Sequence, residues 1–356
     1  MNAEQKKICV GLVGFGFAGS TFHAPVIAAV DALQLVAVAS SQAEAVHAAW
    51  PTVRVMPEAS QLFADPDVDL VVIAAPNEAH FSLALAALSA GKHVVVDKPF
   101  TITSAEAAIL IACARQNNRL LSVYHNRRWD ADFLSLQDLL AQGTLGRIAT
   151  FESHFDRFRP QIKQRWRELD SPGGGLLYDL GPHLIDQALV LFGMPSHLFA
   201  DIALQRDGAA AVDYFHLVLY YAQMRVILHA GSLVNQVGPR FSVHGERGSF
   251  VKFGLDPQED SLRAGGNPRD ANWGQDAVSA RLSLGSSAGA IDLPMRRGCY
   301  QNYYEGIATA ITHGSPAPVS AEDGMRAIVL IETALRSAAS GKVLELEPIS
   351  ASAHGL

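Results

Sequence analysis

The first 125 residues alternate between short runs of apolar, often β-branched residues and longer runs rich in alanine and leucine. Short apolar runs without polar interruptions are typical of strands that are buried on both faces, as in a parallel sheet. The longer runs fit helices, and one of them follows Thr103-Ser-Ala-Glu106, the pattern of a capping box. The strands are predicted at residues 8–13, 34–40, 69–75, 93–97 and 120–124. This alternation predicts a doubly wound α/β domain over residues 1–124, with a parallel sheet.

After Tyr124 the apolar runs follow one another without intervening helices, which indicates antiparallel strands joined by turns. These strands are predicted at residues 148–158, 213–221, 224–233, 240–245 and 249–254. Residues 254–294 are rich in Gly, Asp, Ser and Pro and lack a period, so we expect surface loops there. Helices are predicted at residues 303–313 and 320–340. The pattern therefore predicts a second domain over residues 125–356, of the α+β class with an open, mostly antiparallel sheet.

Composition narrows the class of protein. A length of 356 residues suits two domains, and the 49% hydrophobic and 18% charged residues are typical of globular proteins. A formal net charge of −7 argues against a nucleic-acid binder, because neutralising phosphates requires a basic surface. The three cysteines form no CxxC pair, which argues against disulfides and thiolate metal sites. No apolar run resembles a signal peptide or a membrane span, so we expect a cytoplasmic protein.

A glycine-rich motif, GFGFAG, follows the first strand and precedes a predicted helix over residues 19–30. Such a motif can be only a tight turn, but its position after a strand and before a helix is typical of a dinucleotide-binding Rossmann fold. Gly14 would allow the turn, Gly16 would let the pyrophosphate approach, and Gly19 would let the helix pack on the strand. The predicted cofactor contacts in this loop are Gly14, Phe15, Gly16, Phe17 and Ala18.

The end of the second strand bears on the choice of cofactor. An acid there would hold the ribose hydroxyls of NAD and repel a 2′-phosphate. This chain has Ser40 and Ser41 instead, whose hydroxyls can donate to a phosphate, so NADP is favoured. No arginine follows directly, the nearest being Arg54, and the use of NAD stays open.

Asp97-Lys98-Pro99 follows the fourth strand of the first domain. The carboxyl ends of parallel strands face the ligand crevice of an open α/β sheet, so Lys98 is predicted to meet the nicotinamide. An ordinary surface lysine after a strand is the alternative.

The segment GGGLLYDLGPH leads into a helical pattern that stops at Gly193. Pro182 suits a first helical turn, which predicts that His183 lies in that turn with Asp179 just ahead of the helix. The helix dipole would then lower the pKa of His183 and favour a neutral imidazole that accepts protons, oriented by Asp179. The alternative is that both residues merely cap and anchor the helix. A metal site is not expected, because no third ligand stands at a suitable spacing.

Two further segments carry candidate binding residues. Residues 157–167 contain five cations interleaved with aromatic residues, a pattern that fits a loop lining a substrate site, an RNA contact or a solvated face. We favour the substrate loop because the chain is acidic and contains a dinucleotide motif. Asn126 and Arg127 follow the fifth strand and are predicted to reach the cofactor or substrate.

Taken together, these motifs resemble those of the glucose-fructose oxidoreductase, inositol dehydrogenase and rhizopine catabolism (Gfo/Idh/MocA) family. The resemblance covers nearly the whole chain and rests on GFGFAG, DKP and GGGxxxDxGxH in this order. The segments YHNRRWD, FESHFDRFRP, RWRE, YDLGPHLIDQ, DYFHL and FVKFGLDPQED resemble the branch that contains NADP-dependent scyllo-inositol dehydrogenases.

The resemblance implies a Rossmann domain followed by an α/β domain whose open sheet often forms an oligomer interface, so a homodimer or homotetramer is expected. It places the family's catalytic lysine on Lys98 and its Asp and His pair on Asp179 and His183. Further cofactor contacts are implied for Pro76, Asn77, His80, Asp97, Trp166 and Arg167. Family members usually carry Glu in place of Asp97, a departure that can alter how the lysine or ribose is held.

The hypothesis from the sequence is an NADP(H)-preferring dehydrogenase of a cyclic polyol or sugar. His183 would be the general base, Asp179 would fix its tautomer, and Lys98 would stabilise charge on the reacting oxygen. The remaining substrate hydroxyls are assigned to His125, Arg165 and Tyr303. Alternatives are a reductase of an aldehyde, ketone or tetrapyrrole, an NAD-dependent glycoside-cleaving enzyme, and a regulator that senses a sugar or dinucleotide without turnover.

Overall fold

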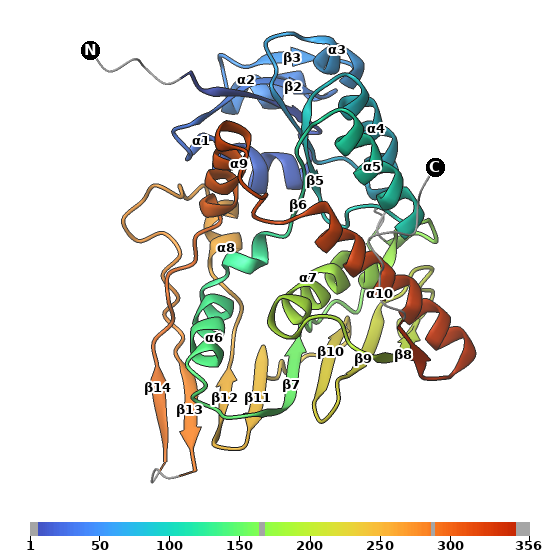
Figure 1. Cartoon of the computed structure of the whole chain (residues 1–356), viewed down its shortest axis with the longest axis vertical. Coiled ribbons are helices and arrows are strands. Elements are labelled where there is room, and N and C mark those ends of the chain that lie inside the picture. The colour runs from blue at the N-terminus through green and yellow to red at the C-terminus, as the bar shows by residue number, and fades with distance from the viewer. Residues whose placement is uncertain (1–5, 164–167, 286–288, 347–356) are drawn as a thin grey trace. The chain divides into compact units, whose positions relative to one another are not determined.

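The computed structural model describes residues 6–163, 168–285 and 289–346 (Figure 1). The chain forms two compact units. The first consists of Met1–Leu136, Asp256–Ala277 and Met295–Met325, and the second of Gln137–Leu255, Val278–Pro294 and Arg326–Leu356. Residues 125–136, 256–277 and 295–325, which the sequence analysis assigned to the second domain, therefore belong to the first unit.

The first unit contains a six-stranded parallel sheet in the order β3-β2-β1-β4-β5-β6. Its strands are β1 (Ile8–Val13), β2 (Leu33–Ala39), β3 (Arg54–Met56), β4 (Leu70–Ile73), β5 (His93–Asp97) and β6 (Leu121–Tyr124). The doubly wound Rossmann fold is confirmed, and strands stand at all the predicted places. The sequence analysis missed β3, a short edge strand whose residues are exposed or half-buried.

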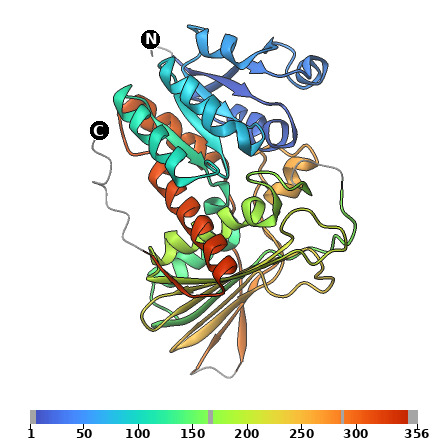
Figure 2. The ribbon, with the colours of Figure 1, turned by 90° about the vertical axis from the view of Figure 1, so that its right-hand side faces the viewer.

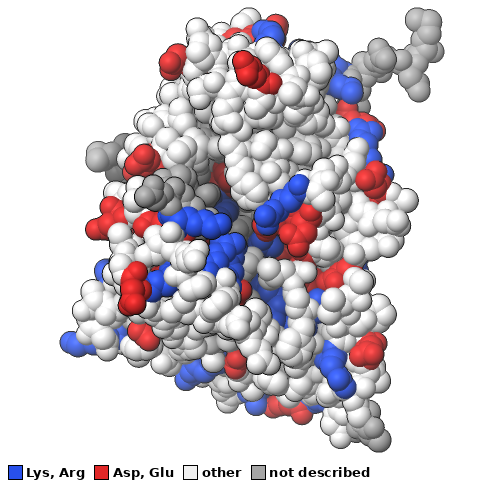
Figure 3. Space-filling view, turned by 180° about the vertical axis from the view of Figure 1, so that it is seen from behind, with Lys and Arg blue, Asp and Glu red and all other residues white. Residues whose placement is uncertain are grey.

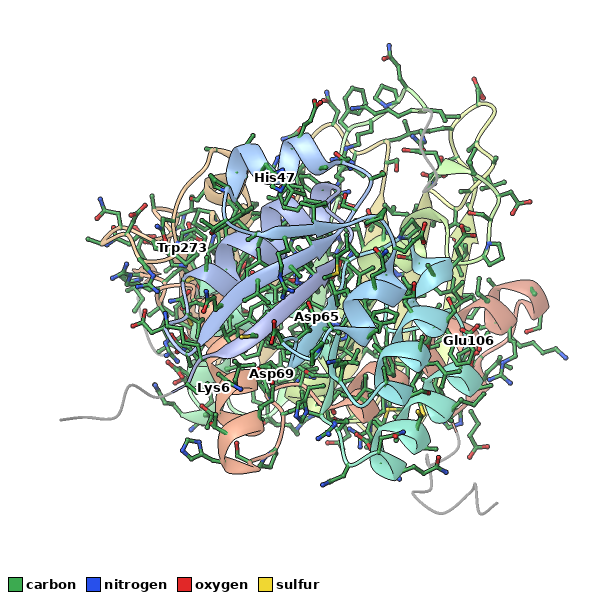
Figure 4. The ribbon with its side chains drawn as sticks, turned by 90° about the horizontal axis from the view of Figure 1, so that it is seen from above. Lys6, His47, Asp65, Asp69, Glu106 and Trp273 are labelled. Carbon is green, nitrogen blue, oxygen red and sulfur yellow. The ribbon has the colours of Figure 1, made fainter. Side chains whose placement is uncertain are left out.

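Helices cover both faces of this sheet. The helices that lie wholly in the first unit are α1 (Ala24–Ala28), α2 (Ala43–Ala49), α3 (Ala59–Ala64), α4 (His80–Ser89), α5 (Ser104–Gln116), α8 (Gln258–Arg263) and α9 (Gln301–His313). Figure 1 shows α4 packed beside α5 on one side and α1 beside α9 on the other. The predicted capping box is confirmed at the start of α5, where the Thr103 side chain accepts from the Glu106 N–H at 3.2 Å (Glu106 is labelled in Figure 4). Two helices, α6 (Ala131–Ala141) and α10 (Ala321–Ser340), run from one unit into the other.

The second unit contains a nine-stranded sheet in the order β14-β13-β12-β11-β7-β10-β9-β8-β15. The β7–β10 pair is parallel and the other pairs are antiparallel, so the predicted mostly antiparallel sheet is confirmed. The strands are β7 (Ile148–His154), β8 (His197–Ala203), β9 (Tyr214–Tyr220), β10 (Arg225–Gly231), β11 (Phe241–Gly245), β12 (Gly248–Lys252), β13 (Ala280–Leu284), β14 (Ala290–Leu293) and β15 (Leu344–Glu345).

The prediction of surface loops over residues 254–294 is wrong, because this stretch contains α8, β13 and β14. Only Ala280 and Leu282 are buried in β13, and every residue of β14 is exposed or half-buried. These two strands therefore lack the apolar run or the sustained alternation from which a strand is predicted.

Helix α7 (Gly175–Phe192) lies over one face of the nine-stranded sheet, against β9 and β10 (Figure 2). Alternate residues of β9, namely Phe215, Leu217 and Leu219, are buried on this side. Since successive side chains of a strand point to opposite faces, His216 on β9 and His229 on β10 point to the other face, where they are half-buried.

Among the described residues, no helix is long and apolar enough to cross a membrane. On the side of the molecule shown in Figure 3, basic and acidic side chains stand next to one another in small groups. Such mixing of charges differs from the continuous basic surface that phosphate backbones require.

Candidate active site

The glycine-rich loop joins β1 to a short π-helical turn at Ala18–His23. Gly14 has a φ of +93°, and a Cβ atom there would press on the carbonyl oxygen of Ala74. A Cβ on Gly19 would likewise press on the carbonyl oxygen of Gly14, so Gly19 allows the helix to close on the loop itself. At Gly16, by contrast, a Cβ would meet nothing within 4 Å. The chain thus needs Gly14 and Gly19 for folding, whereas the space over Gly16 fits a pyrophosphate at a helix N-terminus.

This difference predicts opposite outcomes for two alanine variants. Gly16→Ala is expected to keep the melting temperature and to weaken NADPH binding at least about tenfold, or about 1.4 kcal/mol, because the new methyl group occupies the phosphate's approach. Gly14→Ala is expected to lower the melting temperature. Fluorescence titration of NADPH and thermal unfolding measure the two effects, and an unchanged NADPH affinity in Gly16→Ala would contradict the assignment of this loop.

Ser40 and Ser41 follow β2, and the nearest arginine along the chain, Arg54, does not point toward them. The Ser40 Oγ accepts a hydrogen bond from the Gln42 N–H at 3.0 Å, which leaves its own proton available for donation. Arg54 forms an ion pair with Asp65, with Nη1 and Oδ2 2.8 Å apart. Asp65, labelled in Figure 4, precedes β4 and thus lies toward the amino ends of the strands, away from the edge where a dinucleotide binds. This pairing disfavours Arg54 as the ligand of a 2′-phosphate.

The turn after β5 is held by a buried carboxylate. Asp97 Oδ1 accepts from the Lys98 backbone N–H at 2.8 Å and lies 3.8 Å from Nε2 of His23. The other ring nitrogen of His23 is 2.6 Å from the Tyr304 hydroxyl. Burial alone would raise the pKa of Asp97, but the nearby imidazole of His23 and the charge of Lys98 hold the pKa below its usual value. Asp97 is therefore an anion that fixes the backbone from which the Lys98 side chain extends.

His80 ties this turn to the neighbouring one. Pro76 and Asn77 follow β4, and the fully buried ring of His80 lies 3.0 Å from the Ala75 carbonyl oxygen and 2.8 Å from that of Pro99. Burial lowers the pKa of His80, so the ring is neutral and donates to one carbonyl at a time. This placement favours a positioning role for His80 in place of the predicted direct contact with the cofactor.

The segment after β6 is more deeply buried than the sequence suggested. His125, Asn126 and Arg127 are all buried. The guanidinium of Arg127 pairs with Glu259 at 2.6 Å and with Asp130 at 3.4 Å. These carboxylates occupy Arg127 within the first unit, which disfavours the predicted contact of this side chain with the cofactor.

Tyr303, assigned to the substrate by the sequence analysis, is a fully buried residue of the first unit. Its hydroxyl lies 2.7 Å from that of Ser122, and its ring packs edge-on against Tyr124 and Trp129. The structure therefore gives Tyr303 a packing role.

In the second unit, α7 begins earlier than predicted. It starts at Gly175, so that Asp179 lies beyond its first turn, His183 beyond its second, and Pro182 inside the helix. The predicted dipole effect on His183 is therefore wrong, because that influence falls off within the first turn. Asp179 and His183 are four residues apart, which places both on one side of α7.

The glycine run explains this early start. Gly175 has a φ of +79°, and a Cβ atom there would come within 2.9 Å of the Val212 nitrogen. The next residue, Leu176, donates its N–H to the Val212 carbonyl at 2.6 Å. Only glycine lets the helix begin this close to the segment that leads into β9.

Asp179 has a cationic partner that the sequence analysis did not assign. Arg157 Nη1 is 3.5 Å from Asp179 Oδ2, and its guanidinium lies 5.0 Å from the centre of the Phe155 ring. Both charged residues border a small cavity of about 20 Å³, whose other lining residues include Arg159, Glu168, Arg206 and Ser232. That volume is enough for about one water molecule.

Arg206 organises the chain beside this cavity. It pairs with Asp213 at 2.9 Å and with Glu168 at 2.6 Å. It also donates to the carbonyl oxygens of Arg159 and Gln161. Sequence reasoning assigned no role to this group, because Arg206 belongs to none of the motifs and the three charged residues have no regular spacing. The predicted site residues Arg165, Trp166 and Arg167 lie outside the described residues.

Each unit thus assembles part of the predicted site. The glycine loop and the turns after β2, β4 and β5 share the carboxyl edge of the parallel sheet, while α7 carries Asp179 and His183 with Arg157 beside them. That Lys98 meets His183 stays a prediction.

Comparison with known proteins decides the family. Residues 8–125 match the family model for the NAD-binding Rossmann fold of an oxidoreductase family, and residues 137–346 match the model for the C-terminal alpha/beta domain of the same family. The chain belongs to the Gfo/Idh/MocA oxidoreductase family.

Several Gfo/Idh/MocA relatives are similar over nearly their whole length. The uncharacterized oxidoreductase YdgJ of Escherichia coli is 49% identical over 93% of this chain and 96% of its own. The scyllo-inositol 2-dehydrogenase (NADP(+)) IolW of Bacillus subtilis is 42% identical over 96% of both chains. Among solved structures, YvaA of Bacillus subtilis superimposes with a TM-score of 0.94 at 41% identity, over 96% of this chain and 99% of its own.

Proposed function

We propose that this Gfo/Idh/MocA oxidoreductase is an NADP(H)-preferring dehydrogenase that acts on a secondary alcohol of a cyclic polyol or sugar. The observation that carries the proposal is the similarity to IolW, which is named an NADP-dependent inositol dehydrogenase and aligns over 96% of both chains. The arrangement of the carboxyl edge in the first unit and of α7 in the second supports it.

The residues of the chain have distinct roles in the proposed reaction. NADP, when bound, supplies the nicotinamide that accepts the hydride from the substrate carbon. His183 takes the hydroxyl proton of the substrate as general base. The Lys98 ammonium donates a hydrogen bond to the same oxygen and stabilises its developing negative charge. Asp179, held by Arg157 at 3.5 Å, lies on the same side of α7 as His183 and orients the imidazole.

The preference for NADP rests on the end of β2. Ser40 keeps its hydroxyl proton for donation, and Ser41 next to it is exposed. Neither side chain carries a charge that would repel a 2′-phosphate. Without an arginine at this position the preference is expected to be modest.

A substrate panel tests the proposal. Inositol isomers and cyclic sugars are incubated with NADP⁺ and with NAD⁺, and nicotinamide reduction is followed by absorbance. We expect turnover of at least one cyclic polyol, with a higher kcat/KM for NADP⁺ than for NAD⁺. Tight NADPH binding without turnover in either direction would favour a sensing protein, and turnover confined to open-chain aldehydes or ketones would favour the alternative reductase.

A further inference from the structure

Three histidines lie in a row across the face of the nine-stranded sheet that points away from α7. His154 on β7 is the direct neighbour of His229 on the parallel strand β10, and His229 is the direct neighbour of His216 on β9. Glu152 and Asp156 flank His154 at spacings of two residues, so their side chains point to the same face. Imidazole and carboxylate groups are the donors that Zn²⁺ and similar divalent cations prefer.

Asp156 lies between two of the imidazoles. Its Oδ1 is 3.3 Å from Nε2 of His229, and its Oδ2 is 3.5 Å from Nδ1 of His154. The three residues offer ligand atoms that all lie within 4.8 Å of one another. Ligands bound at about 2.1 Å in a tetrahedral site are separated by about 3.4 Å. Each imidazole lies at about this distance from a different oxygen of Asp156, so a small rotation of the carboxylate would direct one oxygen to the metal between the two rings.

Groups around these ligands hold them in orientation. The second ring nitrogen of His154, Nε2, lies 3.3 Å from a carboxylate oxygen of Glu152. The second ring nitrogen of His229, Nδ1, lies 3.3 Å from Nδ1 of His216. The Gly231 N–H donates to Asp156 Oδ1 at 3.0 Å. Metal-binding histidines in proteins commonly donate the N–H of their second ring nitrogen to a carboxylate, as His154 can to Glu152, and such a partner also makes the ligand nitrogen more basic.

The cluster is separate from the proposed catalytic groups. Asp156 is followed directly by Arg157, and adjacent residues of an extended chain point to opposite faces. Arg157 pairs with Asp179 on α7, whereas Asp156 faces the histidine row. The side chain of Asp156 is 5% exposed and that of His154 is 26% exposed, so the cluster is reachable from solvent.

We propose that His154, Asp156 and His229 form a binding site for a divalent transition-metal cation of the Zn²⁺ class. Water completes the tetrahedral coordination, and Glu152 and His216 orient the two imidazoles. The site is independent of the dehydrogenase proposal, since it uses none of the residues assigned to the cofactor or to the reaction.

Metal titration of the full chain tests this site. After dialysis against a chelator, Zn²⁺ is titrated by calorimetry, and Co²⁺ is titrated by its visible absorption, which is stronger in four-coordinate sites than in water. We expect one Zn²⁺ per chain with a dissociation constant below about 10 μM, or about −7 kcal/mol. A dissociation constant above about 100 μM, or a stoichiometry other than one, overturns the proposal.

Variants locate the site. Asp156→Asn keeps the shape of the side chain and is expected to weaken Zn²⁺ binding at least about 100-fold, while Glu152→Gln, which removes only an orienting group, weakens it about tenfold. His244→Gln is the matched control, because His244 is an exposed histidine of β11 that bonds to Ser249. Circular dichroism checks that each variant is folded. Equal losses in His244→Gln and Asp156→Asn would show surface binding and would overturn the site.

Discussion

Replacement of His183 by alanine is expected to lower kcat about 1,000-fold, the middle of the range for loss of a general base. His183 is 6% exposed and lies four residues from Asp179 on α7, and alanine is expected to leave the helix intact. No part of the glycine loop or of the turns after β2, β4 and β5 changes. The dissociation constant of NADPH is therefore expected to stay the same. Steady-state kinetics with the polyol found in the panel, together with NADPH titration, measure both quantities.

The matched control is His197→Ala, which removes an exposed imidazole of β8. It is expected to keep the activity of the parent chain. A loss below about tenfold in His183→Ala, or an equal loss in His197→Ala, would contradict the assignment of the general base.

A double variant tests the prediction that His183 and Lys98 act on the same substrate oxygen. Lys98→Met alone is expected to lower kcat about 100-fold or more, because the charge on the reacting oxygen loses its donor. Catalytic groups that act on the same atom lose activity less than multiplicatively when they are removed together. The double variant is therefore expected to be little worse than His183→Ala. A full product of the two losses would show that the residues act independently.

The sequence predicted the first unit well because its strands are buried on both faces. β1, β4 and β5 each form a nearly continuous apolar run, and the residues between them carry local signals such as the Thr103 cap. Local sequence signals do not predict strands that are short or that have few buried residues. β3 has only three residues, β13 pairs with β12 across an intervening segment that contains α8, and β14 pairs with β13 but has no buried residue.

In the candidate site too, local motifs predicted some positions, whereas contacts with remote segments determine others. The motif positions Gly14, Gly16 and Lys98 stand at the predicted edge, since Gly14 and Lys98 directly follow strands and Gly16 lies two residues after Gly14. The predicted start of α7 is too late, because Pro182 suits a first helical turn, whereas the contact of Gly175 with Val212 begins the helix earlier. Partners such as Glu259 for Arg127 and Ser122 for Tyr303 come from remote segments, so no local pattern could indicate them.

Arg206→Met is expected to lower the free energy of unfolding by about 3–5 kcal/mol, the range for breaking a buried ion pair. The Arg206 side chain is 6% exposed, and its partners Asp213 and Glu168 are 1% and 9% exposed. Methionine fills much of the same volume, but it removes the cation that pairs with both carboxylates. Urea denaturation followed by circular dichroism measures the loss.

Two comparisons separate the charge effect from a simple loss of packing. Arg225→Met, on the exposed end of β10, is the control and is expected to cost less than about 1 kcal/mol. Adding Asp213→Asn and Glu168→Gln to Arg206→Met removes the two carboxylate charges that Arg206 neutralised and is expected to restore part of the lost stability. If the triple variant is no more stable than Arg206→Met, buried charge is not the cause. Because Arg206 also binds the carbonyls of Arg159 and Gln161, a confirmed charge effect would mean that one buried cation supports the segment beside the Arg157–Asp179 pair.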